Sequence, residues 1–201
     1  MTELKKRVLA NMTPIRKFAL LLLSRQDNQE IPGNLWYQKE LFLLSKVFED
    51  LGDETNFEPH LFGPHSELAE EEMEELVQLG VVKRSSERGN NYSLTPLGKE
   101  IADEVSKKSS QKEIETADEI KEFLNDLNRE ELLTYIYGSY PAMTEESIAS
   151  KPITQKRHEN ALRLYQKGKV SFGKAAELAG MHVGQFAKFL HGKGIKVDVS
   201  V

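Results

Sequence analysis

Three side chains near the end of the chain are of types that can contact the edges of DNA bases. His182, Gln185 and Lys188 recur every three residues, so on a helix they share one face. A glutamine amide can bond adenine through two hydrogen bonds, and lysine and histidine can reach bases or phosphates. Gly184 and Ala187 are small enough to let such a helix sit deep in a major groove. We therefore predict a base-reading helix here.

Four lysines flank this face and predict phosphate contacts: Lys169, Lys174, Lys193 and Lys196. Residues 151–201 contain ten Lys/Arg and three Asp/Glu, a net charge of +7. The whole chain has a net charge of −5, which leaves −12 for residues 1–150. Such an asymmetry predicts that the two parts have different functions, one of them favouring polyanions.

The elements expected to hold these residues form a helix–turn–helix. Ser171 can cap a helix over residues 172–179, Gly180 suits a tight turn that needs positive φ, and a second helix follows from about 182 to 190. The alternative is a helical hairpin that serves only as scaffold. The residues expected to pack inward are small on the first helix and large beyond it: Ala175, Ala176, Ala179, Met181, Phe186 and Phe189.

Residues 158–197 resemble a small prokaryotic antitoxin-like helix–turn–helix family. Its pattern A-L-x-L-Y-x-x-G-K-x-S-x-G-x-A-A-E-L-A-G-M runs through residues 161–181 of this chain. The resemblance implies a DNA-binding or antitoxin role and implies no reaction.

The first 110 residues show the element order of a winged helix–turn–helix domain. Thr13-Pro14 and Ser66 are typical helix starts, and Gly80 is placed to end the third helix. Two short strand-like runs, 81–84 and 92–95, follow, and Thr95-Pro96 starts a closing helix. We expect the polar stretch 106–112 to be a hinge, followed by helices over about 114–126 and 129–137.

The third helix of this domain carries six glutamates and no Lys or Arg between Ser66 and Leu79. Carboxylates repel the phosphate backbone, so this helix is a poor candidate for DNA contact. We expect it to contact a protein partner or to form a dimer, and the alternative is a solvated acidic face without a partner. The predicted interaction residues are Glu67, Glu70, Glu71 and Glu74.

Residues 1–150 also resemble the SocA-like (Panacea) antitoxin domain and related archaeal winged-helix proteins. The resemblance rests on the Leu61–Ser66 turn LFGPHS, the Tyr92–Gly98 segment YSLTPLG, and later LLTYIY with Tyr140-Pro141. Members of that group act as antitoxins, proteolytic adaptors or regulators, so the resemblance implies a class of protein and no single activity.

Other functions find little support in the sequence. His60 and His65 with Glu58 are too few ligands for a metal site, and Ser66 beside His65 lacks the partners of a catalytic triad. Glycine-rich phosphate loops are absent, so we expect no enzyme activity, no cofactor and no metal. The charged start, the absence of cysteine and the short apolar run 18–23 favour a cytoplasmic protein without a membrane span.

The sequence therefore predicts a mainly α protein with a small β-hairpin wing. The expected parts are a winged-helix domain (1–110), a helical extension (111–150) and a basic helix–turn–helix module (151–201). The favoured function is a prokaryotic, antitoxin-like transcriptional regulator that binds double-stranded DNA, with a toxin, a protease or a second copy as protein partner. The alternative is an antitoxin or protease adaptor that does not bind DNA.

Overall fold

The computed structural model describes residues 3–85 and 90–195. It confirms the mainly α fold with one two-stranded antiparallel hairpin in the described part of the chain. The chain forms two compact units: unit 1 comprises residues 1–58 and 64–126, and unit 2 comprises 59–63 and 127–201. The division falls inside the segment predicted as a helical extension.

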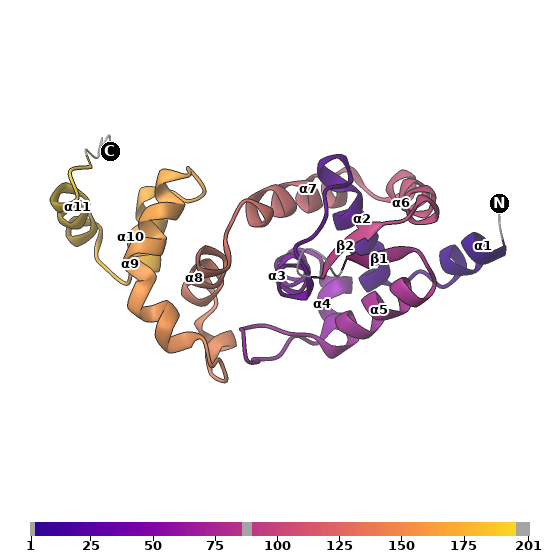
Figure 1. Cartoon of the computed structure of the whole chain (residues 1–201), viewed down its shortest axis with the longest axis horizontal. Helices are drawn as coiled ribbons and strands as arrows, with labels where there is room; N and C mark the ends of the chain where they lie inside the picture. The colour runs from indigo at the N-terminus through magenta and orange to yellow at the C-terminus, as the bar shows by residue number, and fades with distance from the viewer. Residues whose placement is uncertain (1–2, 86–89, 196–201) are drawn as a thin grey trace. The chain divides into compact units, whose positions relative to one another are not determined.

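Unit 1 contains the elements expected for a winged helix, in the expected order (Figure 1). α2 runs through its core: residues 18–23 are all fully buried, because other elements of the unit surround this helix. A helix that is apolar on every side is stable only when it is enclosed in this way. The elements are α1 (Glu3–Ala10), α2 (Pro14–Asn28), α3 (Asn34–Ser45), α4 (Glu49–Thr55), α5 (Glu67–Gln78), β1 (Val82–Ser85), β2 (Asn91–Leu94), α6 (Pro96–Lys108) and α7 (Gln111–Asn125).

The end of α2 is held by a lysine from α7. Helical geometry breaks at Arg25, and the next three residues all have positive φ, between 51° and 60°. The fully buried Lys121 ammonium donates hydrogen bonds to three carbonyl oxygens there: to Leu22 at 2.8 Å, to Arg25 at 3.1 Å, and to Gln29. A cation at a helix C-terminus also interacts favourably with the helix dipole. Lys121 therefore fixes both the end of α2 and the packing of α7.

Glu40 on α3 is the least compensated buried group of unit 1. It is fully buried, and neither carboxylate oxygen has a hydrogen-bond partner among the described residues. Burial raises the pKa of this carboxyl well above its ordinary value of 4.5, and the nearby Lys121 ammonium opposes this only in part. Glu40 is therefore neutral in the folded chain at pH values where the unfolded chain ionises it.

This difference predicts a pH dependence of stability. Above pH 4.5 unfolding releases a proton from Glu40, so the free energy of unfolding should fall by up to about 1.4 kcal/mol per pH unit between pH 5 and 7. Burial lowers the pKa of the neighbouring Lys39 to about 7, which contributes with the opposite sign at higher pH. Urea unfolding of Glu40→Met at pH 5, 6 and 7 should show a shallower slope than the unchanged chain. Equal slopes would contradict a neutral Glu40.

The hairpin is joined to α6 by a compact turn. Thr95 Oγ1 caps α6 by accepting from the Gly98 N–H at 3.1 Å, and it donates to the Gly80 carbonyl at 2.7 Å. A Cβ on Gly98 would overlap the carbonyl oxygen of Val81, which also accepts from the Thr95 N–H at 3.0 Å. The Thr-x-x-Gly spacing is thus required by this close approach of two backbones.

Two sequence predictions of unit 1 differ from the structure. The apolar residues indicate a second helix over about 35–50 and an irregular connection over 52–65, but α3 ends at Ser45, and a separate helix, α4, covers Glu49–Thr55. Phe48 has an extended backbone, which separates the two helices. The break between helices expected within 106–112 is shorter than predicted: only Ser109 and Ser110 separate α6, which continues to Lys108, from α7, which starts at Gln111 with a capping box between Ser110 and Glu113.

The regular secondary structure of unit 2 is helical in the described part of the chain. α8, α9 and α10 contact one another, and α10 also contacts α11 (Figure 1). Residues 59–63 join this unit: Ile148 donates to the Leu61 carbonyl at 3.2 Å, and Arg129 lies 4.7 Å from the Phe62 ring. Its elements are α8 (Arg129–Ser139), the 3-10 helix η2 (Pro141–Thr144), α9 (Ser150–Gln166), α10 (Phe172–Ala179) and α11 (Val183–Gly192).

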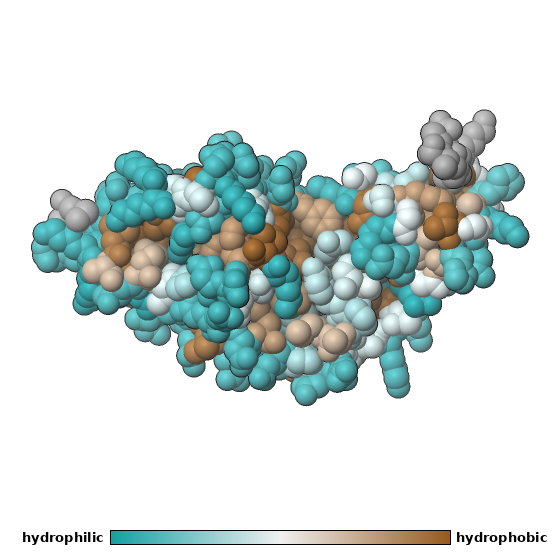
Figure 2. Space-filling model, turned by 180° about the vertical axis from the view of Figure 1, so that it is seen from behind, coloured by the Kyte–Doolittle hydropathy of each residue, from teal (hydrophilic) through white to brown (hydrophobic). Residues whose placement is uncertain are grey.

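Hydrophilic residues cover most of the face shown in Figure 2, and hydrophobic residues reach the surface between them. None of the helices in the described ranges is long and apolar enough to cross a membrane. Among the residues that the structure describes, the exposed large apolar side chains are Val47, Leu61, Leu68, Ile148 and Val183.

Candidate nucleic-acid interface

The predicted helix–turn–helix is present as α10, a short turn and α11. Ser171 caps α10 by accepting from the Lys174 N–H at 3.2 Å. Gly180 follows in the left-handed region, with φ 65° and ψ 36°, and Met181 then donates back to the Ala176 carbonyl at 2.9 Å. A residue with a side chain is strained at positive φ, so glycine suits the turn.

The inner face of this motif is only partly as predicted. The three alanines are buried on α10, and Phe186 is fully buried beneath α11. Phe186 lies 5.5 Å from the Phe172 ring and 6.0 Å from the Phe189 ring, within the range of favourable aromatic contacts. Met181 and Phe189 are half-buried, so they border the core and do not fill it. Leu190, which was not predicted, is fully buried instead.

The outer face of α11 is open. His182, Gln185 and Lys188 are all exposed, together with Val183 and Gly184. A Cβ added at Gly184 would meet nothing within 4 Å. This face therefore holds base-reading candidates on a surface that packs against no other element of unit 2.

Gln185 has a second role that its sequence position could have indicated. Its Oε1 accepts a hydrogen bond from the His182 N–H at 3.1 Å, so Gln185 closes the first turn of α11 as the third residue of a capping box does. Bonding adenine through both amide atoms would require Oε1 either to accept a second hydrogen bond or to leave this contact. Nε2 can donate to a base without disturbing the helix start.

The predicted phosphate-binding lysines differ in their surroundings. Lys174 pairs with Glu177 at 2.6 Å, and the Lys193 ammonium lies 5.7 Å from the Phe189 ring. Lys188 is exposed on α11, and Lys169 is half-buried just after α9. Lys196 lies outside the described residues. The motif itself thus brings exposed cations to α11 at Lys188 and Lys193.

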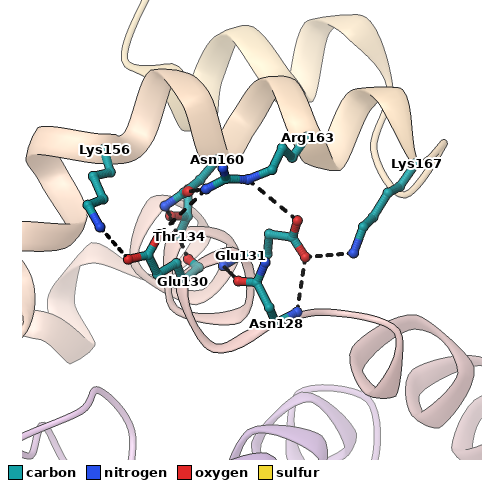
Figure 3. Close-up of polar contacts among 8 residues, drawn as sticks. All are labelled: Asn128, Glu130, Glu131, Thr134, Lys156, Asn160, Arg163 and Lys167. Atoms are coloured by element: carbon teal, nitrogen blue, oxygen red, sulfur yellow. Dashed lines mark hydrogen bonds and ion pairs between the residues drawn. The ribbon is translucent and has the colours of Figure 1, made fainter.

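Three further cations of the basic segment are neutralised within unit 2 (Figure 3). Glu130 of α8 pairs with Lys156 at 2.6 Å and with Arg163 at 3.5 Å. The buried Glu131 pairs with Lys167 at 2.8 Å. The Lys156 hydrogen bond is the main reason that the pKa of Glu130 lies below its ordinary value.

Further hydrogen bonds from Asn160 and Asn128 complete this arrangement. Asn160 donates from Nδ2 to Thr134 Oγ1 at 2.8 Å, and its Oδ1 accepts from Arg163. Asn128 and Glu131 form a capping box at the start of α8, with both bonds at 3.0 Å. The Asn-x-x-Glu spacing could have indicated the helix start, but the sequence gives no local signal for the partners of these carboxylates.

Unit 2 as a whole has a smaller net charge than residues 151–201 alone, because it also contains the acidic residues of 127–150. Unit 2 contains eleven Lys/Arg and seven Asp/Glu, a net charge of +4. Cations outside the α8–α9 contact carry most of its uncompensated positive charge. Two of them, Lys188 and Lys193, are exposed on α11 or at its end.

The acidic helix α5 is also largely paired within its own unit. Of the four predicted interaction residues, Glu70 pairs with His65 at 3.3 Å and Glu74 pairs with Arg84. Glu67 and Glu71 are exposed, and Leu68 between them has 47% of its surface accessible. The start of α5 is therefore accessible and is both acidic and apolar, whereas the exposed residues further along the helix, Glu75 and Gln78, are polar.

The described residues contain no cluster of three or more His, Asp or Glu side chains placed to hold a metal ion. Residues 140–201 match the family described as Uncharacterised protein family (UPF0175). No curated protein and no solved structure matches the chain. The family match covers η2 to α11 and leaves out residues 1–139, for which the resemblance to SocA-like domains stays a prediction.

Proposed function

We propose that the chain is a prokaryotic DNA-binding regulator with an antitoxin-like role, and that α11 enters the major groove. The observation that carries this proposal is the open outer face of α11. His182, Gln185 and Lys188 project from it, and the small Gly184 leaves space for close approach. A recognition helix needs these two properties together, donors at its surface and no bulky neighbour.

Affinity in this proposal comes from phosphate contacts by the cations around α11. Lys188 and Lys193 lie on the helix or at its end, and Lys169 and Lys174 lie on the preceding elements. Each phosphate contact contributes about 0.9 to the slope of log affinity against log salt concentration. The cations held by Glu130 and Glu131 contribute little, because DNA would first have to displace a carboxylate.

The experiment is a fluorescence-anisotropy titration of the full-length chain with random and genomic duplexes across a salt series. Lys188→Ala should weaken binding to every duplex and lower the salt slope by about one. Lys107→Ala on α6, where the side chain is 69% exposed, removes an equal charge from unit 1 and should leave both quantities unchanged. Equal effects of the two substitutions would contradict α11 as the interface.

Sequence preference is tested by Gln185→Ala and Gln185→Glu in the same assay. Alanine removes the whole amide, so both the proposed base contact and the capping bond to the His182 N–H are lost. Glutamate keeps an oxygen that can cap the helix but loses the Nε2 donor. Both variants should relax or change the ranking of duplexes by affinity. Thermal melting measures the loss of stability that follows from losing the capping bond. An unchanged ranking in both variants would exclude Gln185 as a base reader.

A second candidate function is an interaction protein that does not bind DNA. The exposed first turn of α5, with Leu68 between Glu67 and Glu71, favours a protein contact in either case. Such a contact would serve a toxin, a protease or a second copy. No binding of any duplex by the full chain at low salt would favour this candidate over the first.

A further inference from the structure

Unit 2 contains a pocket of about 260 Å³ where α8, η2, α9 and α10 meet. Its wall includes Thr134 and Tyr137 from α8, Ile153 and Arg157 from α9, and Glu177 from α10. This volume lies just under the ~300–1,000 Å³ of sites for drug-sized ligands. The pocket therefore has room for a small metabolite.

The charge of the pocket favours an anion. Arg157 is half-buried at its wall and makes no hydrogen bond or ion pair with any residue in the described ranges. Glu177, the acidic residue of the wall, is already paired with Lys174 at 2.6 Å. An unpaired guanidinium binds carboxylate or phosphate oxygens well, because it offers several donors in one plane.

The rest of the wall suits the body of such a molecule. Thr154 and Ser150 add hydroxyl groups from the start of α9, and Ile153 adds apolar surface. The Tyr137 hydroxyl is fixed by a 2.6 Å hydrogen bond to Ser147. A ligand with one anionic group and one or more hydroxyls would match these groups.

Arg157 also contacts the turn of the helix–turn–helix. A Cβ on Gly180 would collide with the Arg157 guanidinium, so the guanidinium packs directly on the glycine backbone. Gly180 sets the path of the chain from α10 to α11. The same side chain therefore borders the pocket and the turn that positions α11.

We propose that this pocket binds a small organic anion, a carboxylate or a phosphate ester with hydroxyl groups, through Arg157, and that occupancy is transmitted to α11 at Gly180. The consequence for DNA binding rests on the proposed function. Occupancy of the pocket and the change at α11 do not depend on the proposed function, because both can be measured without DNA.

The test is a titration of the ¹⁵N-labelled full-length chain, followed by amide chemical shifts at constant ionic strength. The probes are glycerol 3-phosphate, succinate and inorganic phosphate, with glycerol as the uncharged control. At least one anion, added to about 20 mM, should produce saturable shifts at Gly138 and Gly180, and a smaller shift at Gly184 on α11. Glycerol should produce none.

Arg157→Met should weaken the binding at least tenfold, and Arg157→Lys should retain part of it. Lys151→Met is the matched control, because it removes an exposed charge from the same helix outside the pocket. Circular dichroism confirms that each variant is folded, and Arg157→Lys replaces Arg157→Met in the comparison if the latter is not.

Three results would overturn the proposal: no saturable shift with any of the anions, equal shifts with glycerol, or unchanged binding in the Arg157 variants. Shifts confined to Gly138, with none at Gly180 or Gly184, would overturn the transmission to α11. A failure of DNA binding with these shifts intact would count against the proposed function alone.

Discussion

Replacement of Lys121 with methionine is expected to lower the free energy of unfolding of unit 1 by about 3 kcal/mol. The ammonium is fully buried and donates to three carbonyl oxygens at the end of α2. Methionine fills a similar volume but donates no hydrogen bond, so the three carbonyls would lose their donor, and the buried Leu22 would be left with an unsatisfied carbonyl oxygen. The measurement is urea unfolding at pH 7, followed by circular dichroism.

Lys112→Met is the control for this substitution. Lys112 lies on the same helix and is exposed, with its ammonium 5.5 Å from the Phe48 ring. Its loss should cost less than about 1 kcal/mol. Similar losses for the two lysines would mean that the carbonyls of α2 find other donors, and the role assigned to Lys121 would be wrong.

Gly98→Ala is expected to have an effect at least as large, about 3 kcal/mol or more. The new methyl group would overlap the Val81 carbonyl oxygen, which is held in place by a hydrogen bond from the Thr95 N–H at 3.0 Å. Relief requires α6 and the hairpin to separate, and this would expose apolar residues such as Ile101 and Leu94.

Gly173→Ala provides the contrast, because a Cβ at Gly173 would meet nothing within 4 Å and the residue lies in a helix. That substitution should be neutral or should stabilise unit 2 by a few tenths of a kcal/mol, up to about 1. Thermal melting of both variants measures these two effects on stability. A melting temperature for Gly98→Ala within about 2 °C of the unchanged chain would show that the two backbones are not in close contact.

Local signals in the sequence predicted many of the helix starts. Thr13, Ser66, Thr95 and Ser171 each accept a hydrogen bond from the backbone N–H three residues later, as their positions before a helix suggested. Gly80 and Gly180 have the positive φ expected of residues that end helices. These features depend on a few neighbouring residues, which is why a single sequence was sufficient.

Features that depend on distant residues were not predicted. Lys121 lies on a largely polar helix, and only the fold shows that it reaches the end of α2, nearly 100 residues earlier. Similarly, Lys156 and Lys167 contribute to the net charge of +7 over residues 151–201, and only the fold shows that carboxylates from α8 neutralise them. The base-reading role of Gln185 stays a prediction, and its capping bond is a local feature that the sequence reading missed.

The ion pairs between α8 and α9 limit how residues 140–201, the segment that matches the family, can be transplanted to another protein. A graft that begins at residue 140 leaves Glu130 and Glu131 behind, so Lys156, Arg163 and Lys167 lose their resident counterions. Such a graft would adsorb to any polyanion, and its affinity for DNA would overstate that of the parent. A faithful transplant needs residues 127–139 as well, and also 59–63, which the chain supplies from within the sequence of unit 1.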